Sequence, residues 1–290
     1  MAPDEGPLLP RRRLGAELRR IRGHRTLDEV ADATLISTSK LSRLENGQGA
    51  PQPRDIRDLI VFYDVDTATA DRLRQWAGAG RRQAWWKQYS DVVSPPLNAY
   101  LDFESGASTI RAFALSLIPG LLQTAEHAGH ILGKLPPPRT AEQIQRLIEI
   151  RGRRQELLLA ARSRTRLITV IDEGALHRKV GSPAEMHAQL DQLHRLSLLR
   201  NITIQILPYD AGVHAGLLGM FTVFQFADDV DRDIVAIETH SGQRYLKEQS
   251  SVQEYLRVFD GLSHRAHDPD ESRELLEKIM STLPAPKDPR

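Results

Sequence analysis

The stretch that most constrains the fold is Thr26–Gly47, TLDEVADATLISTSKLSRLENG, which has the pattern of two short helices joined by a tight turn. Thr26 is a good N-cap, and Glu29, three residues later, completes a capping box. Ser37 caps the second helix. Asn46-Gly47 ends that helix, because glycine takes the left-handed conformation after a helix without strain. The sequence therefore predicts a helix-turn-helix.

The side chains of this stretch divide into an inward and an outward set. Ala31 supplies the small side chain that two closely crossing helices need, and Ile36 is expected to plug the core from the turn. Leu41 and Leu44 are expected to point inward from the second helix. The outward side chains are short or cationic, which suits the major groove of DNA. They are Thr38, Ser39, Lys40, Ser42 and Arg43.

Apolar periodicity predicts three further helices around this pair. The first covers residues 11–23, the fourth begins after Pro53, and the fifth begins near Asp66. The sequence therefore predicts an all-α, five-helix, repressor-like helix-turn-helix domain over residues 11–82. Residues 1–10 contain three prolines and are expected to form a disordered leader.

Positive charge is concentrated just before the motif, although the net charge of the whole chain is only +1. Residues 11–25 hold seven arginines and a single acid, Glu17. A local basic face on a nearly neutral protein favours a confined anion-binding surface, with Arg12 as a phosphate contact. The alternative is a solvated helix face, because charge runs are often only solvated.

Four segments carry a more specific resemblance: LGAELRRIR, TLDEVAD, ISTSKLSRLENG and the proline-containing loop that follows. In this order they resemble the XRE family of phage-repressor-like helix-turn-helix regulators, and LSRLENG is the most diagnostic of them. The resemblance implies a homodimer on a pseudo-palindromic operator in double-stranded DNA, with the second helix of the motif in the major groove. The alternative is a helix-turn-helix that serves only as a protein-interaction module.

The XRE resemblance also assigns roles to single residues. Base-edge contacts fall on Thr38, Ser39 and Arg43, while Lys40 is expected to reach a base or a phosphate. Phosphate contacts from helix N-termini and loops fall on Thr26, Ser37, Asn46 and Arg54.

Two residues of the motif depart from the family pattern. Leu27 stands where many members have glutamine, so one contact with DNA is expected to be absent. Leu35 replaces the usual glycine of the turn, so the turn is expected to be altered or strained.

The rest of the chain predicts an α+β domain, a mixed sheet with helices, over residues 85–283. Strands are expected over residues 166–171, 202–207, 220–226 and 234–238. Helices are expected over residues 101–117, 124–132, 140–162, 183–199, 250–263 and 270–283. The helix between the first two strands predicts a parallel β-helix-β unit, and the later strands predict an antiparallel meander. Residues 284–290 are expected to be a disordered tail.

A second resemblance rests on YLDFESGAS, LIPGLLQT, DEGALHRKVGS and ILPYDAGVHAG, which follow in this order. With the first domain they resemble the actinobacterial WhiJ-like, antitoxin-like group of XRE regulators over essentially the whole chain. That resemblance implies a sensor or partner-binding domain, often paired with a small protein encoded nearby, and no known catalytic site. Glu104 is a candidate partner contact, although Ser105 follows where the family usually has a second acid.

Other patterns in this domain are less specific. Glu173, at a strand end beside Asp172, can line a ligand pocket with His177, whereas loop capping is the simpler interpretation of the two acids. Trp85-Trp86 either stacks on a base or ligand or anchors a contact between domains. The histidines do not form a zinc-binding motif and the chain has no cysteine, so no metal is expected.

Together these patterns predict a sequence-specific DNA-binding transcriptional regulator that needs no cofactor and is not an enzyme. The competing hypothesis is an antitoxin-like protein that mainly sequesters a small partner, with DNA binding as autoregulation. The chain has neither a membrane-spanning apolar window nor a signal peptide. A cytoplasmic location, with the nucleoid as the site of action, is therefore expected.

Overall fold

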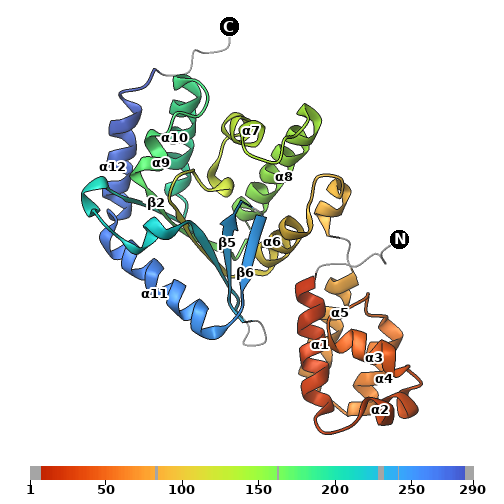
Figure 1. The fold of residues 1–290 in the computed structure, drawn as a ribbon. Coiled ribbons are helices and arrows are strands. Elements are labelled where there is room, and N and C mark those ends of the chain that lie inside the picture. The colour runs from red at the N-terminus through yellow and green to blue at the C-terminus, as the bar shows by residue number, and fades with distance from the viewer. Residues whose placement is uncertain (1–7, 82–83, 162, 228–231, 241, 285–290) are drawn as a thin grey trace. The chain divides into compact units, whose positions relative to one another are not determined.

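A computed structural model of the chain describes residues 8–81, 84–161, 163–227, 232–240 and 242–284. The chain forms two compact units (Figure 1). The first unit contains five helices and the end of a sixth, and the second contains a six-stranded sheet with its covering helices. In the described ranges, no helix combines the length and the apolar character that a membrane span requires.

The helices of the first unit follow the signals in the sequence closely. They are α1 (Leu8–Arg22), α2 (Leu27–Thr34), α3 (Thr38–Glu45), α4 (Pro53–Tyr63) and α5 (Thr67–Arg81). The first helix begins at Leu8 rather than at Arg11, because Leu9 is buried and extends the apolar face of the helix. Residues 8–10 of the predicted leader are therefore helical, and its residues 1–7 lie outside the described residues.

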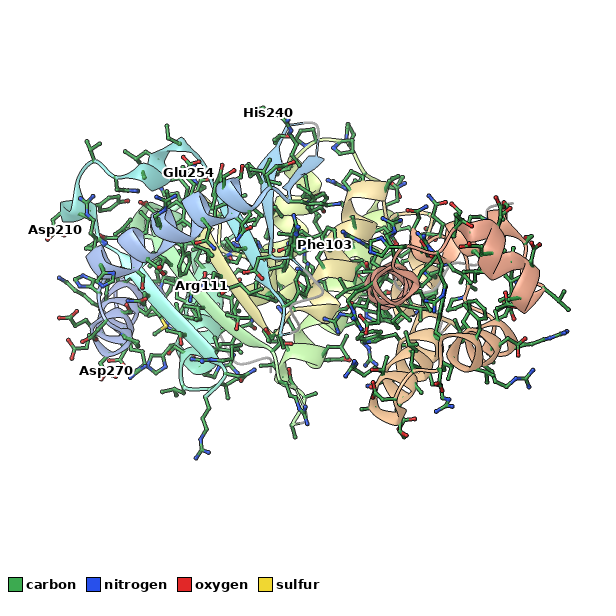
Figure 2. All side chains as sticks on the ribbon, turned by 90° about the horizontal axis from the view of Figure 1, so that it is seen from below. Phe103, Arg111, Asp210, His240, Glu254 and Asp270 are labelled. Atoms are coloured by element: carbon green, nitrogen blue, oxygen red, sulfur yellow. The ribbon has the colours of Figure 1, made fainter. Side chains whose placement is uncertain are left out.

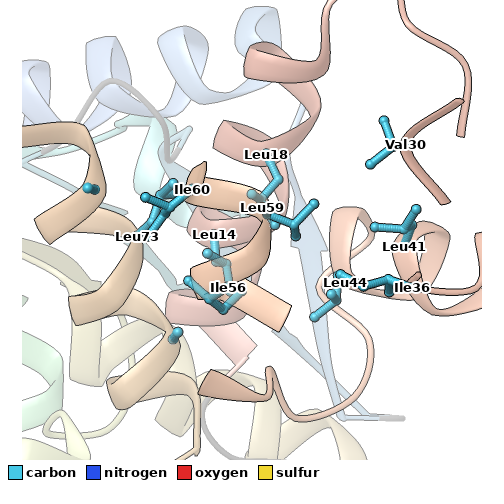
Figure 3. Close-up of a cluster of buried hydrophobic side chains, with 12 residues drawn as sticks. Leu14, Leu18, Val30, Ile36, Leu41, Leu44, Ile56, Leu59, Ile60 and Leu73 are labelled. Carbon is cyan, nitrogen blue, oxygen red and sulfur yellow. The ribbon is translucent and has the colours of Figure 1, made fainter. Parts of the chain in front are cut away.

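The core of the first unit joins all five helices (Figure 3). Leu14 and Leu18 of α1, Leu41 and Leu44 of α3, and Leu73 of α5 are at most 5% exposed. Burial of this kind contributes about 1.5–3 kcal/mol for each large apolar side chain. The remaining buried members are Val30, Ile36, Ile56, Leu59, Ile60, Ala70 and Ala77. The inward positions predicted in the helix-turn-helix are confirmed.

The closest backbone approach around the motif lies between α1 and α3. A Cβ atom at Gly15 would stand 2.5 Å from the carbonyl oxygen of Leu44 and 2.6 Å from that of Glu45. Glycine is therefore required where α1 crosses the end of α3. The small residue predicted from the sequence was Ala31, at the contact of α2 with α3, and this second crossing was not predicted.

The second unit contains one mixed sheet and the helices that cover it. Its strands are β1 (Thr109–Ala114), β2 (Arg166–Asp172), β3 (Ile202–Leu207), β4 (Phe221–Gln225), β5 (Ile234–Thr239) and β6 (Gly242–Leu246). Its α-helices are α7 (Ala125–Lys134), α8 (Ala141–Leu159), α9 (Glu173–His177), α10 (Pro183–Ser197), α11 (Gln249–Arg265) and α12 (Pro269–Met280). A further helix, α6 (Pro95–Gly106), crosses the boundary between the two units. Short 3₁₀ turns are η1 (Trp85–Tyr89), η2 (Gly120–Leu122), η3 (Tyr209–Ala211) and η4 (Ala215–Leu218).

The strand order is β3-β2-β1-β4-β5-β6. The strands β1, β2 and β3 run parallel, whereas β4, β5 and β6 form an antiparallel meander on the other side of β1. The predicted parallel β-helix-β unit is confirmed as β2-α10-β3. The predicted meander is also confirmed, and β6 adds a strand to it that the sequence analysis missed.

The predicted helix over residues 101–117 is wrong beyond Gly106. The α6 helix ends there, and residues 109–114 form β1, in the interior of the sheet. Thr109 pairs with Arg166 on one side and with Gln225 on the other, so β1 joins the parallel and antiparallel halves.

The two faces of the sheet are covered by different helices. The α11 helix lies across one face, where its Phe259 and Leu262 pack on Phe113 and Val170. Figure 2 shows α11, which carries the labelled Glu254, along the strand that carries the labelled Arg111. Arg111 donates to Asp260 of α11 at 2.9 Å. Figure 1 shows α7 and α8 on the opposite side of the sheet from α11.

Candidate nucleic-acid interface

The helix-turn-helix is held by caps and by one left-handed residue. The Thr26 hydroxyl accepts from the Glu29 amide at 3.2 Å, and the Glu29 carboxylate accepts from the Thr26 amide at 2.7 Å. The predicted capping box is therefore confirmed. Ser37 caps α3 by accepting from the Lys40 amide at 3.4 Å. Between the helices, Leu35 has φ 58° and ψ 25°, and its amide donates to the Ala31 carbonyl at 2.8 Å.

Leu35 is therefore strained as predicted, and its side chain is 88% exposed. The left-handed conformation costs a residue with a Cβ about 1–2 kcal/mol, whereas glycine adopts it freely. Glycine also has more conformational entropy in the unfolded chain, which offsets part of this gain. We therefore expect Leu35→Gly to raise the free energy of unfolding by roughly 0.5–1 kcal/mol. Denaturant titration followed by tryptophan fluorescence measures the change. A loss of stability would show that the exposed leucine makes a contact that outweighs its backbone strain.

The α3 helix presents one exposed polar stripe. Ser39, Arg43 and Asn46 lie at spacings of four and three residues, and all three side chains are exposed. Arg43 has no hydrogen-bond or ion-pair partner in the described part of the chain, so its guanidinium faces solvent. Thr38 is half-buried beside this stripe. Three of the four predicted base-contacting residues therefore lie on or next to one accessible surface.

Lys40, the fourth of these residues, is held by another helix. Its Nζ lies 2.6 Å from Oδ2 of Asp55 on α4, whose side chain is only 10% exposed. A lysine in this pair cannot also reach into a groove without leaving Asp55 unpaired. The structure thus favours an architectural role for Lys40, which fixes α4 against α3, over the predicted contact with a base or phosphate.

The predicted phosphate contacts lie at the ends of helices. Thr26 and Ser37 are the N-caps of α2 and α3, and both are exposed. Arg54, in the first turn of α4, is exposed and lies 3.7 Å from Asp58. The first turn of α2 also carries Asp28 and Glu29, which lowers the attraction of that end for phosphate.

Arg12 and Asn46 are brought together at a hollow between α1 and the end of α3. Its volume is about 520 Å³, and its lining residues are Arg12, Ala16, Arg19, Arg20, Glu45 and Asn46. The Asn46 side chain accepts from Arg19 at 2.6 Å and donates to the Ser42 carbonyl at 2.8 Å. Two predicted phosphate contacts therefore share one arginine-lined surface.

Glu45 is the residue that connects the two helices at this hollow. Both of its carboxylate oxygens accept from Arg22, at 2.6 and 2.9 Å, and Arg19 lies 3.5 Å away. Glu45 therefore ties the end of α3 to α1. The arginines of α1 were a signal in the sequence for this contact, because they need acidic partners.

The basic face of α1 is less positive than its sequence indicates. Arg20 donates twice to Glu17 at 2.8 Å, which lowers the pKa of that carboxyl, and Glu45 neutralises a second arginine. The local count of seven arginines against one acid therefore overstates the charge offered to a ligand. Arg12 has no hydrogen-bond or ion-pair partner among the described residues and remains the best candidate on α1 for a phosphate contact.

Two of the three partner or ligand candidates meet in the second unit. His177 Nε2 lies 3.3 Å from Glu173 Oε1, and its ring stacks on Tyr209 at 5.9 Å. The other Glu173 oxygen accepts from the Tyr209 amide at 2.8 Å. Glu104 lies on the part of α6 that belongs to the first unit, so it does not join them.

Asp172 acts as a cap, as the simpler interpretation predicted. Its Oδ1 accepts from the Gly174 amide at 2.9 Å and starts α9. His214, whose side chain is 5% exposed, lies 3.5 Å from the other oxygen. Sequence reasoning missed α9 and His214, because the histidine comes from a loop 42 positions further along the chain.

Two of the histidines on the helices of this unit pair with carboxylates. His130 contacts Glu185 at 3.2 Å and His194 contacts Glu277 at 3.0 Å. His127 is buried on α7, and desolvation lowers its pKa to about 4. Throughout the described ranges, no group of three or more histidine, aspartate or glutamate side chains is arranged for a metal ion.

The tryptophan pair occupies η1, where the two rings meet edge-on at 5.5 Å. Trp86 is only 3% exposed, so its faces are not available for stacking on a base. Trp85 is half-buried.

Two known families match the two parts of the chain. The helix-turn-helix domain family matches residues 13–73, which confirms the predicted N-terminal motif. A family described as a domain of unknown function (DUF5753) matches residues 97–278, more than half of the chain. Neither a search of curated proteins nor a search of solved structures gave a match. The chain is thus a helix-turn-helix protein that belongs to the DUF5753 family.

Proposed function

We propose that this protein is a sequence-specific DNA-binding transcriptional regulator whose α3 helix enters the major groove. The observation that carries the proposal is the exposed stripe of Ser39, Arg43 and Asn46 on the second helix of a helix-turn-helix. Arginine makes the commonest specific contact with guanine, and Arg43 has no competing partner in the described residues. The hollow at Arg12 and Asn46 supplies a neighbouring surface for phosphates.

The finer features of the proposal rest on resemblance. Resemblance to the XRE family supports a homodimer on a pseudo-palindromic operator, and the WhiJ-like group supports an actinobacterial regulator. Such a protein works in the cytoplasm, on the nucleoid, by binding rather than by catalysis. The second unit then acts as a sensor that binds a small protein or a ligand and changes the affinity for DNA.

Replacing Arg43 with alanine tests the assignment of α3. We expect a loss of about 1–3 kcal/mol in operator binding and a relaxed preference at one base position.

Arg12→Ala is expected to weaken binding to all sequences alike and to reduce the salt slope by about one unit. Selection of bound DNA from a random pool, followed by shift assays at several salt concentrations, measures both effects.

Arg74→Ala provides the matched control for these variants. Arg74 is exposed on α5, outside the two helices of the motif, and pairs with Asp71 at 2.9 Å. Its removal should leave selectivity and salt slope unchanged. If Arg43→Ala binds the selected operator as tightly as the wild type, α3 does not read the bases through Arg43.

An antitoxin-like function is the second candidate, and one surface supports it. Val213, Leu217 and Leu218 are 87%, 52% and 95% exposed on the loop that follows Tyr209. Exposed apolar side chains gathered on one loop are typical of protein-protein contacts. Co-purification of a stoichiometric small protein from the native host would favour this function. If no small protein co-purifies and the chain alone binds the operator, the antitoxin-like function is contradicted.

A further inference from the structure

A small apolar pocket opens on the second unit between α8, α10 and the start of β3. The volume of this α8–α10 pocket is about 180 Å³. Its walls are mostly leucine and isoleucine side chains, namely Leu121, Leu158, Leu159, Leu196 and Ile202. The pocket is separate from the helix-turn-helix and shares no lining residue with the pair Glu173 and His177.

Two glutamines hold the wall of the pocket in place. Both Gln155 and Gln192 line it. The Gln155 amide group donates to the Gln123 carbonyl at 2.6 Å, and the Gln192 amide group donates to the Leu122 carbonyl at 3.1 Å. These bonds join α8 and α10 to the end of η2. The pocket is therefore formed before a ligand arrives, and such preorganisation favours affinity.

The size of the pocket decides what kind of group it can take. Pockets for whole small-molecule ligands usually measure about 300–1,000 Å³. A cavity of about 150 Å³ with similar aliphatic walls, in contrast, holds a benzene ring. The α8–α10 pocket thus has room for one large apolar side chain, such as leucine or phenylalanine. An apolar anchor buried in a pocket of this kind is the usual centre of a protein-protein interface.

Exposed leucines continue the apolar surface beyond the pocket. Leu159, Leu198 and Leu199 are 44%, 62% and 39% exposed. Leu159 lines the pocket itself. The Leu199 amide donates to the carbonyl of Leu196 at 3.1 Å, and its carbonyl accepts from the Ile202 amide at 3.1 Å. Exposed apolar side chains gathered around a pocket are typical of a contact with another protein.

Two arginines lie beside these leucines. The Asn201 side chain donates to the Leu158 carbonyl at 3.0 Å and to the Thr165 carbonyl at 3.2 Å. Arg200 and Arg164, the residues just before Asn201 and Thr165, therefore lie next to the end of α8 that lines the pocket. Both arginines are exposed, and within the described ranges neither guanidinium group has an ion-pair or hydrogen-bond partner.

The positive charge of this surface is not balanced by nearby acids. Residues 157–171 and 192–209 contain no aspartate or glutamate. The acids that precede them on the two helices are already paired, Glu156 with Arg153 at 2.7 Å and Asp191 with Arg195 at 2.9 Å. The pocket is thus surrounded by exposed leucines and unpaired positive charge. A partner with negative charge complements such a surface.

We infer that this surface binds an acidic segment of a partner protein. The segment inserts one large apolar side chain into the α8–α10 pocket and places carboxylates beside Arg164 and Arg200, where they form charge-assisted hydrogen bonds. The inference rests on the proposed sensor role and deepens it, because it names the surface and the chemistry of the partner. It does not involve the DNA-binding unit.

Selection of random peptides displayed on phage against the full-length protein tests this chemistry. We expect the enriched peptides to carry one leucine or aromatic residue flanked by aspartates and glutamates. Fluorescence anisotropy of labelled synthetic copies should show affinity that falls with added salt, because exposed charges are screened. If no such peptide is enriched, the inference is wrong. A rise of the Tm with sodium octanoate in that case would assign the pocket to a small amphiphile instead.

Leu159→Ala removes part of the pocket wall and should weaken peptide binding about fivefold or more. Leu157→Ala is the matched control. Leu157 is 42% exposed on the same helix, but it lies two positions away on another face and does not line the pocket. Its affinity for the peptide should equal that of the wild type. Equal losses in both variants, or no loss in Leu159→Ala, would contradict the site.

Arg164→Glu and Arg200→Glu should each weaken peptide binding about fivefold and reduce its dependence on salt. Arg153→Gln is their control, because Arg153 is paired with Glu156, and its peptide affinity should not change. If binding survives in both charge-reversal variants but is lost in Arg12→Ala or Leu218→Ala, the peptide lies on α1 or on the loop after Tyr209, and the inference fails. Operator binding is measured separately with the Arg43 variant, so failure of the regulator proposal is distinguished from failure of this site.

Discussion

Replacing Glu45 with alanine is expected to lower the free energy of unfolding of the first unit by about 3 kcal/mol. The Glu45 side chain is only 6% exposed and accepts two hydrogen bonds from Arg22, whose side chain is 19% exposed. Removal of one partner from a buried pair leaves the other charge without compensation. We expect a loss at the lower end of the range that is usual for broken buried ion pairs, because the Arg22 side chain keeps some access to water.

Tryptophan fluorescence during denaturant unfolding is the appropriate measurement for Glu45→Ala. The chain has three tryptophans, Trp76, Trp85 and Trp86, and all belong to the first unit. Asp71→Ala is the control, since its pair with Arg74 is more than half exposed on both sides and should contribute at most about 1 kcal/mol. Equal effects of the two substitutions would mean that the α1–α3 pair adds nothing beyond a surface contact.

Gly15→Ala is the second large effect that we expect. The new methyl group would stand 2.5 Å from the Leu44 carbonyl oxygen, so α1 and α3 would have to separate. Overpacking of this kind costs about 1–3 kcal/mol, occasionally more. Alanine recovers up to about 1 kcal/mol through its helix propensity. The expected net loss is therefore up to about 2 kcal/mol, together with weaker operator binding because α3 is displaced.

The same substitution at Gly78 is expected to stabilise the first unit instead of destabilising it. Gly78 lies inside α5, and a Cβ atom there would meet no atom within 4 Å. Gly78→Ala should therefore raise the free energy of unfolding by roughly 0.5–1 kcal/mol. Unfolding curves of the two variants separate the close approach from the general effect of glycine in a helix. A stabilising Gly15→Ala would show that the two helices can separate without loss.

Local signals explain which elements could be predicted from the sequence. The capping box at Thr26 and the serine cap at Ser37 act within a few residues, so they predicted the starts of α2 and α3. The strand β3 was predicted with the bounds that the structure has, because Ile202–Leu207 alternates and is flanked by turn residues. These elements depend on neighbours in sequence rather than on distant partners.

The errors arose where a distant partner decides the structure. The segment Thr109–Ala114 is short and mostly apolar, a pattern that suits either a buried strand or a helix, and only pairing with β2 and β4 makes it a strand. The edge strand β6 has no alternating apolar pattern, since its two apolar side chains, Tyr245 and Leu246, are adjacent in the sequence. At the candidate interface, the pairs Glu45–Arg22 and Lys40–Asp55 join different helices, so spacing within one helix could not reveal them.

The pairing of β1 has a consequence for the order of events during translation. Thr109 needs Arg166 on one edge and Gln225 on the other, so the nascent chain carries this strand with both edges open while more than half of the second unit is still unmade. At typical rates of synthesis the interval is on the order of ten seconds. The first unit, with its local contacts, can complete its fold before then. On the ribosome the protein therefore presents a finished helix-turn-helix together with an unpaired strand, the kind of segment that chaperones shield from aggregation.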